Sequence, residues 1–440
     1  MNRMIRIGTG AGFAGDRIEP AEVLVEHADL DYLILECLAE RTIALAQKRK
    51  KQDNNLGYDN LLEKRMRSLL PRIAGKKVRI ISNMGAANPI AGANKIIEIA
   101  RELNISIKVA AITGDDVLSQ ISLEDEIWET GNPLKNHGNL ISANAYIGVE
   151  ALLDALKSDA QIIIAGRVAD PSLFLAPMIH EFNWPLDDYE RLAKGTVVGH
   201  LLECAGQLTG GYFADPGKKD VKDMAKLGFP YADVSPDGSA VLAKVEQTGG
   251  QITLQTVKEQ LLYEVINPYE YVTPDVIADF TKVQLKEIST GRIHVDGAMG
   301  IAKPNNLKVS VGYDAGYIGE GEITYAGGNA LKRAELAGSI IKERIGHLFS
   351  EFRVDYIGVN SAHRKIFSDT KPYEVRLRIA GKTTDLPTAS LVGEEVEALY
   401  TNGPAGGGGA RKLVNEVVGV VSTFIDRTRV SFHTEWRGCE

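Results

Sequence analysis

The segment AQIIIAGRVAD, residues 160–170, joins a short apolar run to a polar loop that contains a glycine. A β-branched run of this length is typical of a strand that is buried on both faces of a parallel sheet. Gly166, Arg167 and Asp170 then follow the carboxyl end of that strand, where open α/β sheets bind their ligands. The segment therefore predicts an α/β fold with a ligand site beside residues 166–170.

Strand and helix patterns alternate around this segment through the first half of the chain. Strands are predicted at 4–7, 32–36, 78–82, 105–112 and 162–165, and helices after Pro20 and at 40–70, 91–102 and 145–157. Such alternation favours parallel strands joined by right-handed helical crossovers. We therefore predict an α/β domain at residues 1–220, with a mainly parallel sheet and flanking helices, that carries the main candidate site.

The second half of the chain has a different pattern from about residue 222 onward. Strands are predicted at 307–313, paired with 322–325, and at 356–359, 373–379 and 429–433, with helices at 330–352 and 410–427. This mixture predicts an α+β C-terminal domain at residues 221–440. Its glycine-rich segment 402–409 could act as a lid over the site or as a flexible connection.

Composition argues against several classes of partner. The chain has 440 residues and a formal net charge of -8, so it lacks the basic field that nucleic acid binding needs. No apolar run reaches the roughly 18 to 20 residues of a membrane span, and residues 1–10 lack the apolar core of a signal peptide, so we expect a cytoplasmic protein. Its three cysteines are scattered, which favours reduced thiols over a disulfide framework or a zinc site.

A glycine motif near the N-terminus resembles a dinucleotide-binding fingerprint. Residues 10–15 read GAGFAG, and Glu36 follows about twenty residues later. That fingerprint requires a helix that starts within the glycines, which would leave Pro20 in the helix interior at a cost of roughly 3 kcal/mol. Pro20 is better placed at the start of the helix, so an adaptable loop at 8–19, with Gly12 in contact with a substrate, is favoured over NAD or FAD binding.

Two further loops follow predicted strands and could contact a substrate. The first, residues 83–92, contains Asn83, Gly85 and Asn88 and opens a helix, so its free N–H groups could bind an anion, or its asparagines could simply cap the helix. The second is Gly114-Asp115-Asp116, in which one carboxylate could point into the crevice while the other caps a helix. We assign Asp115 a catalytic role and the remaining residues a substrate-binding role.

The segment after residue 170 adds a base, an acid and a thiol. A helix predicted at 188–208 places His200, Glu203 and Cys204 on one face, at positions i, i+3 and i+4. His200, Glu203 and Asp170 are candidates for proton transfer, and Arg167 for anchoring an anion. His200, Glu203 and Cys204 are weaker candidates for a divalent metal site. A buried histidine paired with a carboxylate, and an Arg-Asp pair, are the structural alternatives.

Several blocks together resemble a known family. They include GTGAGFAGDR (8–17), SNMGAANP (82–89), AGRVADPSLFLAPMIHEF (165–182) and GHLLEC (199–204), and the similarity extends from about Ile5 to at least Tyr325. The chain resembles the acyclic terpene utilisation family, the AtuA-like proteins. This resemblance implies a catabolic role on branched, unsaturated acids carried as CoA thioesters, and it carries over no catalytic residues.

The combined reading is a catabolic enzyme that acts on such an acid or its thioester by hydration, dehydration or carbon–carbon lyase chemistry. Both reactions need a group that moves a proton beside a carbonyl and donors for the enolate-like charge, for which the N–H groups of Gly85 and Gly114 are candidates. The expected partner is a small-molecule carboxylate or acyl-CoA, and the Gly210-Gly211 pair leaves room for a second chain in a homo-oligomer. The alternatives are a non-catalytic or partner-dependent subunit and a nicotinamide or flavin oxidoreductase.

Overall fold

The computed structural model describes residues 4–364 and 372–439, which form two compact units. The first unit contains the chain up to residue 136, residues 140–312 and the chain from residue 420 onward. The second contains residues 137–139 and 313–419. Two strands, β14 (Asn306–Ala326) and β17 (Gly408–Asp426), contribute residues to both units. The boundary predicted at residue 220 lies inside the first unit.

Five parallel strands form the centre of the first unit, as the alternating pattern predicts. In spatial order they are β1 (Ile5–Ala11), β2 (Tyr32–Leu35), β3 (Arg79–Ser82), β6 (Ile162–Ala165) and β4 (Ile107–Thr113). Every residue of β6 is buried, which is the consequence of an apolar strand covered on both faces. The strands align their carboxyl ends at one edge of the sheet.

The sheet as a whole is mixed rather than mainly parallel. Antiparallel strands extend it beyond β1 in the order β7 (Pro230–Val234), β8 (Ala240–Lys244), β12 (Arg292–Asp296) and β11 (Gln284–Ser289), and beyond β4 by β18 (His433–Cys439). All five come from the second half of the chain, so that half does not fold apart from the parallel sheet. The α/β class is confirmed, whereas the division into an α/β domain at 1–220 and an α+β domain at 221–440 is not.

Helices of the first unit connect and cover these strands. They are α1 (Glu19–His27), α2 (Glu40–Gln52), α3 (Leu62–Ile73), α4 (Pro89–Glu102), α5 (Glu150–Lys157), α6 (Asp170–Phe182), α7 (Tyr189–Glu203) and α8 (Leu254–Leu262). The predicted helix at 40–70 is two helices, because Asp53, Asn54 and Asn55 form a turn and Gly57 has a φ of 103°. The predicted helix at 145–157 starts later, because β5 (Leu140–Ala145) precedes it. A small sheet of β9 (Tyr271–Val272), β10 (Ile277–Asp279) and β13 (Met299–Ile301) completes the unit.

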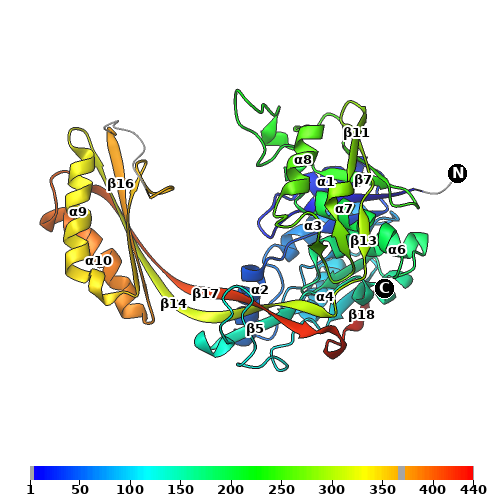
Figure 1. Ribbon diagram of the computed structural model, residues 1–440, viewed down its shortest axis with the longest axis horizontal. Coiled ribbons are helices and arrows are strands. Elements are labelled where there is room, and N and C mark those ends of the chain that lie inside the picture. The colour runs from blue at the N-terminus through cyan, green and yellow to red at the C-terminus, as the bar shows by residue number, and fades with distance from the viewer. Residues whose placement is uncertain (1–3, 365–371, 440) are drawn as a thin grey trace. The chain divides into compact units, whose positions relative to one another are not determined.

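The second unit is a layer of helices on a sheet. Its strands follow the order β15 (Glu351–Ile357), β16 (Glu374–Thr383), β14 and β17, and α9 (Ala330–Ile345) and α10 (Leu386–Asn402) lie together against one face (Figure 1). Burial alternates along β16, because one face packs on the helices. The strands predicted at 307–313 and 322–325 are two parts of the single strand β14, which pairs with β16 rather than with itself.

The prediction of a helix at 410–427 is wrong, because these residues form β17. Val414, Val417, Val418 and Val421 have helical spacing, but valine is stiff at χ1 and favours strands. The strand predicted at 429–433 is likewise displaced, since β18 starts at His433. The glycine-rich segment 402–409 links α10 to β17 in the second unit, and its role as a lid stays a prediction. No helix in the described parts of the chain combines the length and the apolar character that a bilayer crossing requires.

Candidate functional site

A cavity of about 720 Å³ opens in the first unit at the carboxyl ends of β1, β2 and β6. The segments after these strands contribute residues 12–14, 16–17, 36, 38–40, 167 and 170 to its wall. The end of α7 contributes Glu203 and Cys204, and more distant segments contribute Tyr146, Glu264 and Lys308. The position agrees with the site predicted at residues 166–170, since ligand crevices of α/β sheets form at this edge.

The lining of this cavity is acidic, and we call it the acidic pocket. Its carboxyl groups outnumber its basic groups, and the two sets are Asp16, Glu36, Glu40, Asp170, Glu203 and Glu264 against Arg17, Arg167 and Lys308. Carboxyl groups that share a site cannot all ionise without strong mutual repulsion. The surroundings of each carboxyl group therefore decide whether its charged or its neutral form is favoured.

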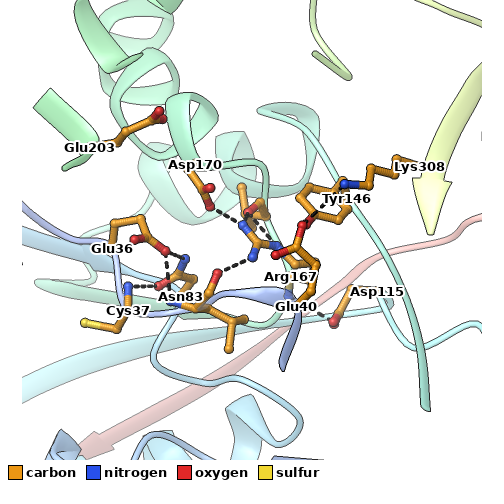
Figure 2. A network of polar contacts seen from close by, with 12 residues as sticks. Glu36, Cys37, Glu40, Asn83, Asp115, Tyr146, Arg167, Asp170, Glu203 and Lys308 are labelled. Carbon is orange, nitrogen blue, oxygen red and sulfur yellow. Dashed lines mark hydrogen bonds and ion pairs between the residues drawn. The ribbon is translucent and has the colours of Figure 1, made fainter. Parts of the chain in front are cut away.

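Arg167 lies beneath the pocket and is 1% exposed. Its guanidinium donates to the carbonyls of Leu38 and Val168 and to the Asp170 carboxylate, and it stacks on the Tyr146 ring with 4.4 Å between Cζ and the ring centroid (Figure 2). These contacts satisfy most of its N–H groups with protein atoms. Its role as an anion anchor stays a prediction, and its observed effect is to fix Asp170 at the start of α6.

Asp115 supports the loop of Arg167 from the side of the sheet. Its Oδ2 accepts hydrogen bonds from the Arg167 backbone N–H at 2.9 Å and from the Asn144 amide at 2.8 Å. A side chain at Gly166 would overlap the Asp115 carboxylate, so this contact needs a glycine. Asp115 is 4% exposed and lies outside the pocket lining. The geometry gives it a supporting position, and a catalytic role for it stays a prediction.

Glu36 and Asn83 form a second buried contact at the strand ends. The Asn83 amide donates to Glu36 Oε1 at 2.9 Å, and its Oδ1 accepts from the Cys37 N–H at 2.7 Å (Figure 2). Burial raises the pKa of Glu36 well above its usual value, and the nearby Asp170 carboxylate raises it further. The surroundings of Glu36 thus favour its protonated form, and Asn83, which is fully buried, orients it rather than lining the pocket.

Glu40 behaves in the opposite way. Its carboxylate accepts from the Tyr146 hydroxyl at 2.5 Å and from Lys308 Nζ at 3.3 Å. Burial alone would raise the pKa of Glu40, but hydrogen bonds from Tyr146 and from its own backbone N–H, together with the charges of Lys308 and Arg167, lower it to about 2. One wall of the pocket thus carries a permanent carboxylate, a few residues along the chain from the protonated Glu36.

The hydrogen bonds of His200 indicate whether Glu203 carries a proton. His200 is 1% exposed between the rings of Tyr271 and Phe280, and burial lowers the pKa of this imidazole to about 4. Its Nε2 lies 3.0 Å from the Gln260 carbonyl oxygen, which can only accept, so Nε2 carries the hydrogen. The lone pair of Nδ1 then faces Glu203 Oε1 at 2.9 Å.

With His200 neutral, Glu203 donates this hydrogen bond in its carboxylic acid form. Burial raises the pKa of Glu203 well above its usual value, and the charges of Asp170 and Glu264 add to the effect. Its second oxygen, Oε2, is buried with no protein partner. The spacing predicted for the 188–208 helix is confirmed in this pair, which holds one proton at the edge of the acidic pocket.

Cys204 directly follows Glu203, and both belong to the donor set predicted for a metal ion. Burial raises the pKa of the Cys204 thiol above its usual value, so the thiol stays protonated. Within residues 4–364 and 372–439, no three His, Cys, Asp or Glu side chains are grouped to hold a metal ion. The donor set proposed from His200, Glu203 and Cys204 therefore lacks the geometry of a metal centre.

The remaining predicted residues fall into two groups. Gly12 lines the pocket, where a side chain would collide with the Cys204 backbone, so the loop after β1 packs closely on the end of α7. Gly85, Asn88, Gly114 and Asp116 lie outside the lining. Asn88 caps α4 by accepting from the Ala91 N–H at 3.2 Å, which is the structural alternative considered for that loop. Their substrate-binding roles stay predictions.

The glycine motif at 10–15 does not open directly into a helix. Gly10 and Ala11 belong to β1, a loop covers residues 12–18, and α1 begins at Glu19 with Pro20 in its first turn. Pro20, expected as the first helical residue, is the second, and the predicted loop at 8–19 is shorter because β1 extends to Ala11. The arrangement lacks the strand–turn–helix contact by which a dinucleotide fingerprint binds pyrophosphate.

Several pocket residues have no role in the sequence prediction. Glu36 could have been assigned by the rule used for Asp115, because it directly follows a buried strand. Glu40, Tyr146, Glu264 and Lys308 come from a helix start and from loops or strands far along the chain. Their convergence depends on tertiary packing, which no local pattern reports.

Comparisons with known proteins bear on the family. No match was found among curated proteins or among solved structures. The model of the family described as acyclic terpene utilisation family protein AtuA matches residues 5–436. Because this match spans nearly the whole chain and confirms the resemblance of its sequence blocks, the protein belongs to the acyclic terpene utilisation family AtuA.

Proposed function

We propose that the protein is an acid–base catalyst that adds or eliminates water, or cleaves a carbon–carbon bond, next to the carbonyl of a branched or unsaturated acyl group. The observation that carries the proposal is the pair His200–Glu203, which holds a neutral carboxylic acid at the edge of a pocket that also contains ionised carboxylates. Titratable groups whose surroundings push their pKa values apart are the usual basis for acid and base roles in one site.

Glu203 acts as the acid and Asp170 as the base. Glu203 donates a proton to the departing oxygen in the elimination direction. Asp170 removes a proton from the carbon beside the carbonyl, and burial raises the pKa of Asp170, which suits a base that works near neutral pH. Arg167 holds Asp170 in place, and His200 is a positioning residue that keeps Glu203 protonated.

The charge of the pocket favours a thioester over a free acid. With Glu36 and Glu203 neutral, a free carboxylate would enter a lining in which four carboxylates face three basic groups, whereas a thioester carbonyl is neutral. The substrate class we propose is therefore the acyl-CoA. The family name supports a branched or unsaturated acyl group.

Proton exchange in deuterium oxide tests this function without knowledge of the reaction direction. Branched 2-enoyl and 3-hydroxyacyl thioesters of CoA are incubated with the protein, and deuterium beside the carbonyl is measured by mass spectrometry. Wild type should exchange, and Glu203→Gln and Asp170→Asn should each reduce the rate by about 10²- to 10⁴-fold. Glu98→Gln on α4, an exposed residue paired with Lys95, is the matched control and should exchange as wild type does. Equal rates in all four proteins would exclude the assigned roles.

A further inference from the structure

A second cavity, of about 620 Å³, adjoins the acidic pocket. The two share Tyr146, Asp170 and Lys308 in their linings, and Figure 2 shows Asp170 and Tyr146 beside Arg167, with Lys308 beyond the Tyr146 ring. Both cavities lie within the first unit. The junction thus lies at the residue proposed to move a proton, and a ligand long enough to enter both cavities would pass Asp170.

The walls of the second cavity are mostly carbon, and we call it the apolar pocket. They include Pro171, Pro274, Leu307, Phe424 and the rings of Tyr146 and Tyr271. Among its described lining residues, the charged side chains are Asp170 and Lys308, which are the two at the junction. The side chains of the lining therefore change from charged to apolar with distance from the acidic pocket.

Apolar side chains at this pocket are left in contact with water. Val272 is 59% exposed and Phe424 is 46% exposed, although both are large hydrophobic residues. Covering such surface with a hydrocarbon gains free energy in proportion to the area removed from water. A volume of about 620 Å³ is also within the usual range for small-molecule sites.

We propose that the apolar pocket is the subsite for the hydrocarbon chain of the acyl substrate. The chain lies against Leu307, Pro274 and Phe424, and the carbonyl end lies at the junction beside Asp170. The assignment of the chain to an acyl substrate rests on the proposed function. The binding of a hydrocarbon chain at this pocket does not depend on catalysis and can be measured separately.

Neutral alcohols test the subsite without the reacting group. Binding of the series from 1-butanol to 1-octanol to the full chain is measured by titration calorimetry, and the affinity should rise about threefold to fourfold for each added methylene. Trp128 packs edge-on against Phe424 with 6.1 Å between ring centroids, so its fluorescence should change on binding, and this change should be absent in Trp128→Phe.

Two variants locate the binding. Val272→Asp places a charge on an exposed wall residue, and Phe424→Ala removes a wall, so each should weaken 1-octanol binding at least tenfold. Ile266→Asp, at a residue that is 92% exposed and lines neither pocket, is the matched control and should bind as wild type does. Affinity that is independent of chain length, or undiminished in both variants, overturns the subsite. Proton exchange that fails while 1-octanol binds as expected removes the proposed reaction and leaves the subsite standing.

Discussion

Burial raises the pKa of Glu203, and a hydrogen bond to His200 supports the same protonated form. Because His200 Nδ1 accepts from the neutral acid, it stabilises that form. His200→Phe fits between the rings of Tyr271 and Phe280 but cannot accept. In wild type, the exchange rate should fall at the high pH where Glu203 loses its proton. In His200→Phe, this fall should occur about one pH unit lower. His200→Gln, which can accept, should restore much of the shift. A lower rate whose fall stays at the wild-type pH would contradict this positioning role.

The same histidine links stability to pH. The pKa of His200 is about 4 in the folded protein and has its usual value of 6.5 in the unfolded chain. As the pH falls, the unfolded chain therefore takes up a proton first. Its contribution is fully present above pH 6.5 and is lost as the pH falls to about 4. The difference in unfolding free energy between wild type and His200→Phe should therefore decrease by about 3 kcal/mol over this range. Denaturant titrations at several pH values measure it, and a constant difference would show that His200 titrates normally.

Gly166 is constrained by contact rather than by its backbone angles. A methyl group there would overlap the Asp115 carboxylate that holds the Arg167 N–H. Gly166→Ala should lower the free energy of unfolding by about 1 to 3 kcal/mol, which is the usual cost of overpacking. Gly438→Ala on β18, where the nearest atom is 3.8 Å away, is the control and should change it little. Thermal unfolding of both variants compares them, and equal stability would mean that Asp115 can move aside.

At the scale of elements, the cap of α8 reaches the site. The Thr253 hydroxyl accepts from the Thr256 N–H at 3.2 Å in a capping box, and the same helix carries the Gln260 carbonyl that holds His200. Thr253→Ala should cost about 0.5 to 2 kcal/mol of stability and reduce proton exchange, whereas Thr253→Ser keeps the cap and should do neither. Urea unfolding and the exchange assay check this together. Lost stability with unchanged exchange would uncouple the cap from the site.

Elements differ in how well their sequences predict them. β6 is predicted correctly because each of its residues is apolar and three are isoleucine, so strand propensity and burial agree. β17 is misread because its valines also have helical spacing, and pairing with β14 decides the outcome. Part of the site is predictable in the same way, because Glu36 and Arg167 come just after strands that the sequence indicates. Lys308 and Glu264 reach the pocket only through packing of distant segments, which periodicity cannot show.

At the scale of the whole molecule, the two units have separate hydrophobic cores. Leu377 is fully buried in the core of the second unit, whereas all three tryptophans, Trp128, Trp184 and Trp436, belong to the first. Leu377→Ala should destabilise the second unit by about 2 to 5 kcal/mol. Calorimetry should then show one transition at a lower temperature, while the transition seen by tryptophan fluorescence stays unchanged. Leu33→Ala, in the core of the first unit, should shift the fluorescence transition instead. If Leu377→Ala moves both signals equally, the units unfold as one.

The pairing of β18 with β4 has a consequence during protein synthesis. Thr113 and His433 stand opposite each other in the sheet but are 320 residues apart in the chain. A ribosome that adds about 5 to 20 residues per second needs roughly 15 to 60 s to produce the second strand after the first. During that interval the outer edge of β4 has no strand to pair with, and open edges readily pair with other chains. Until β18 has been made, the nascent protein thus carries an open strand edge at which it can aggregate.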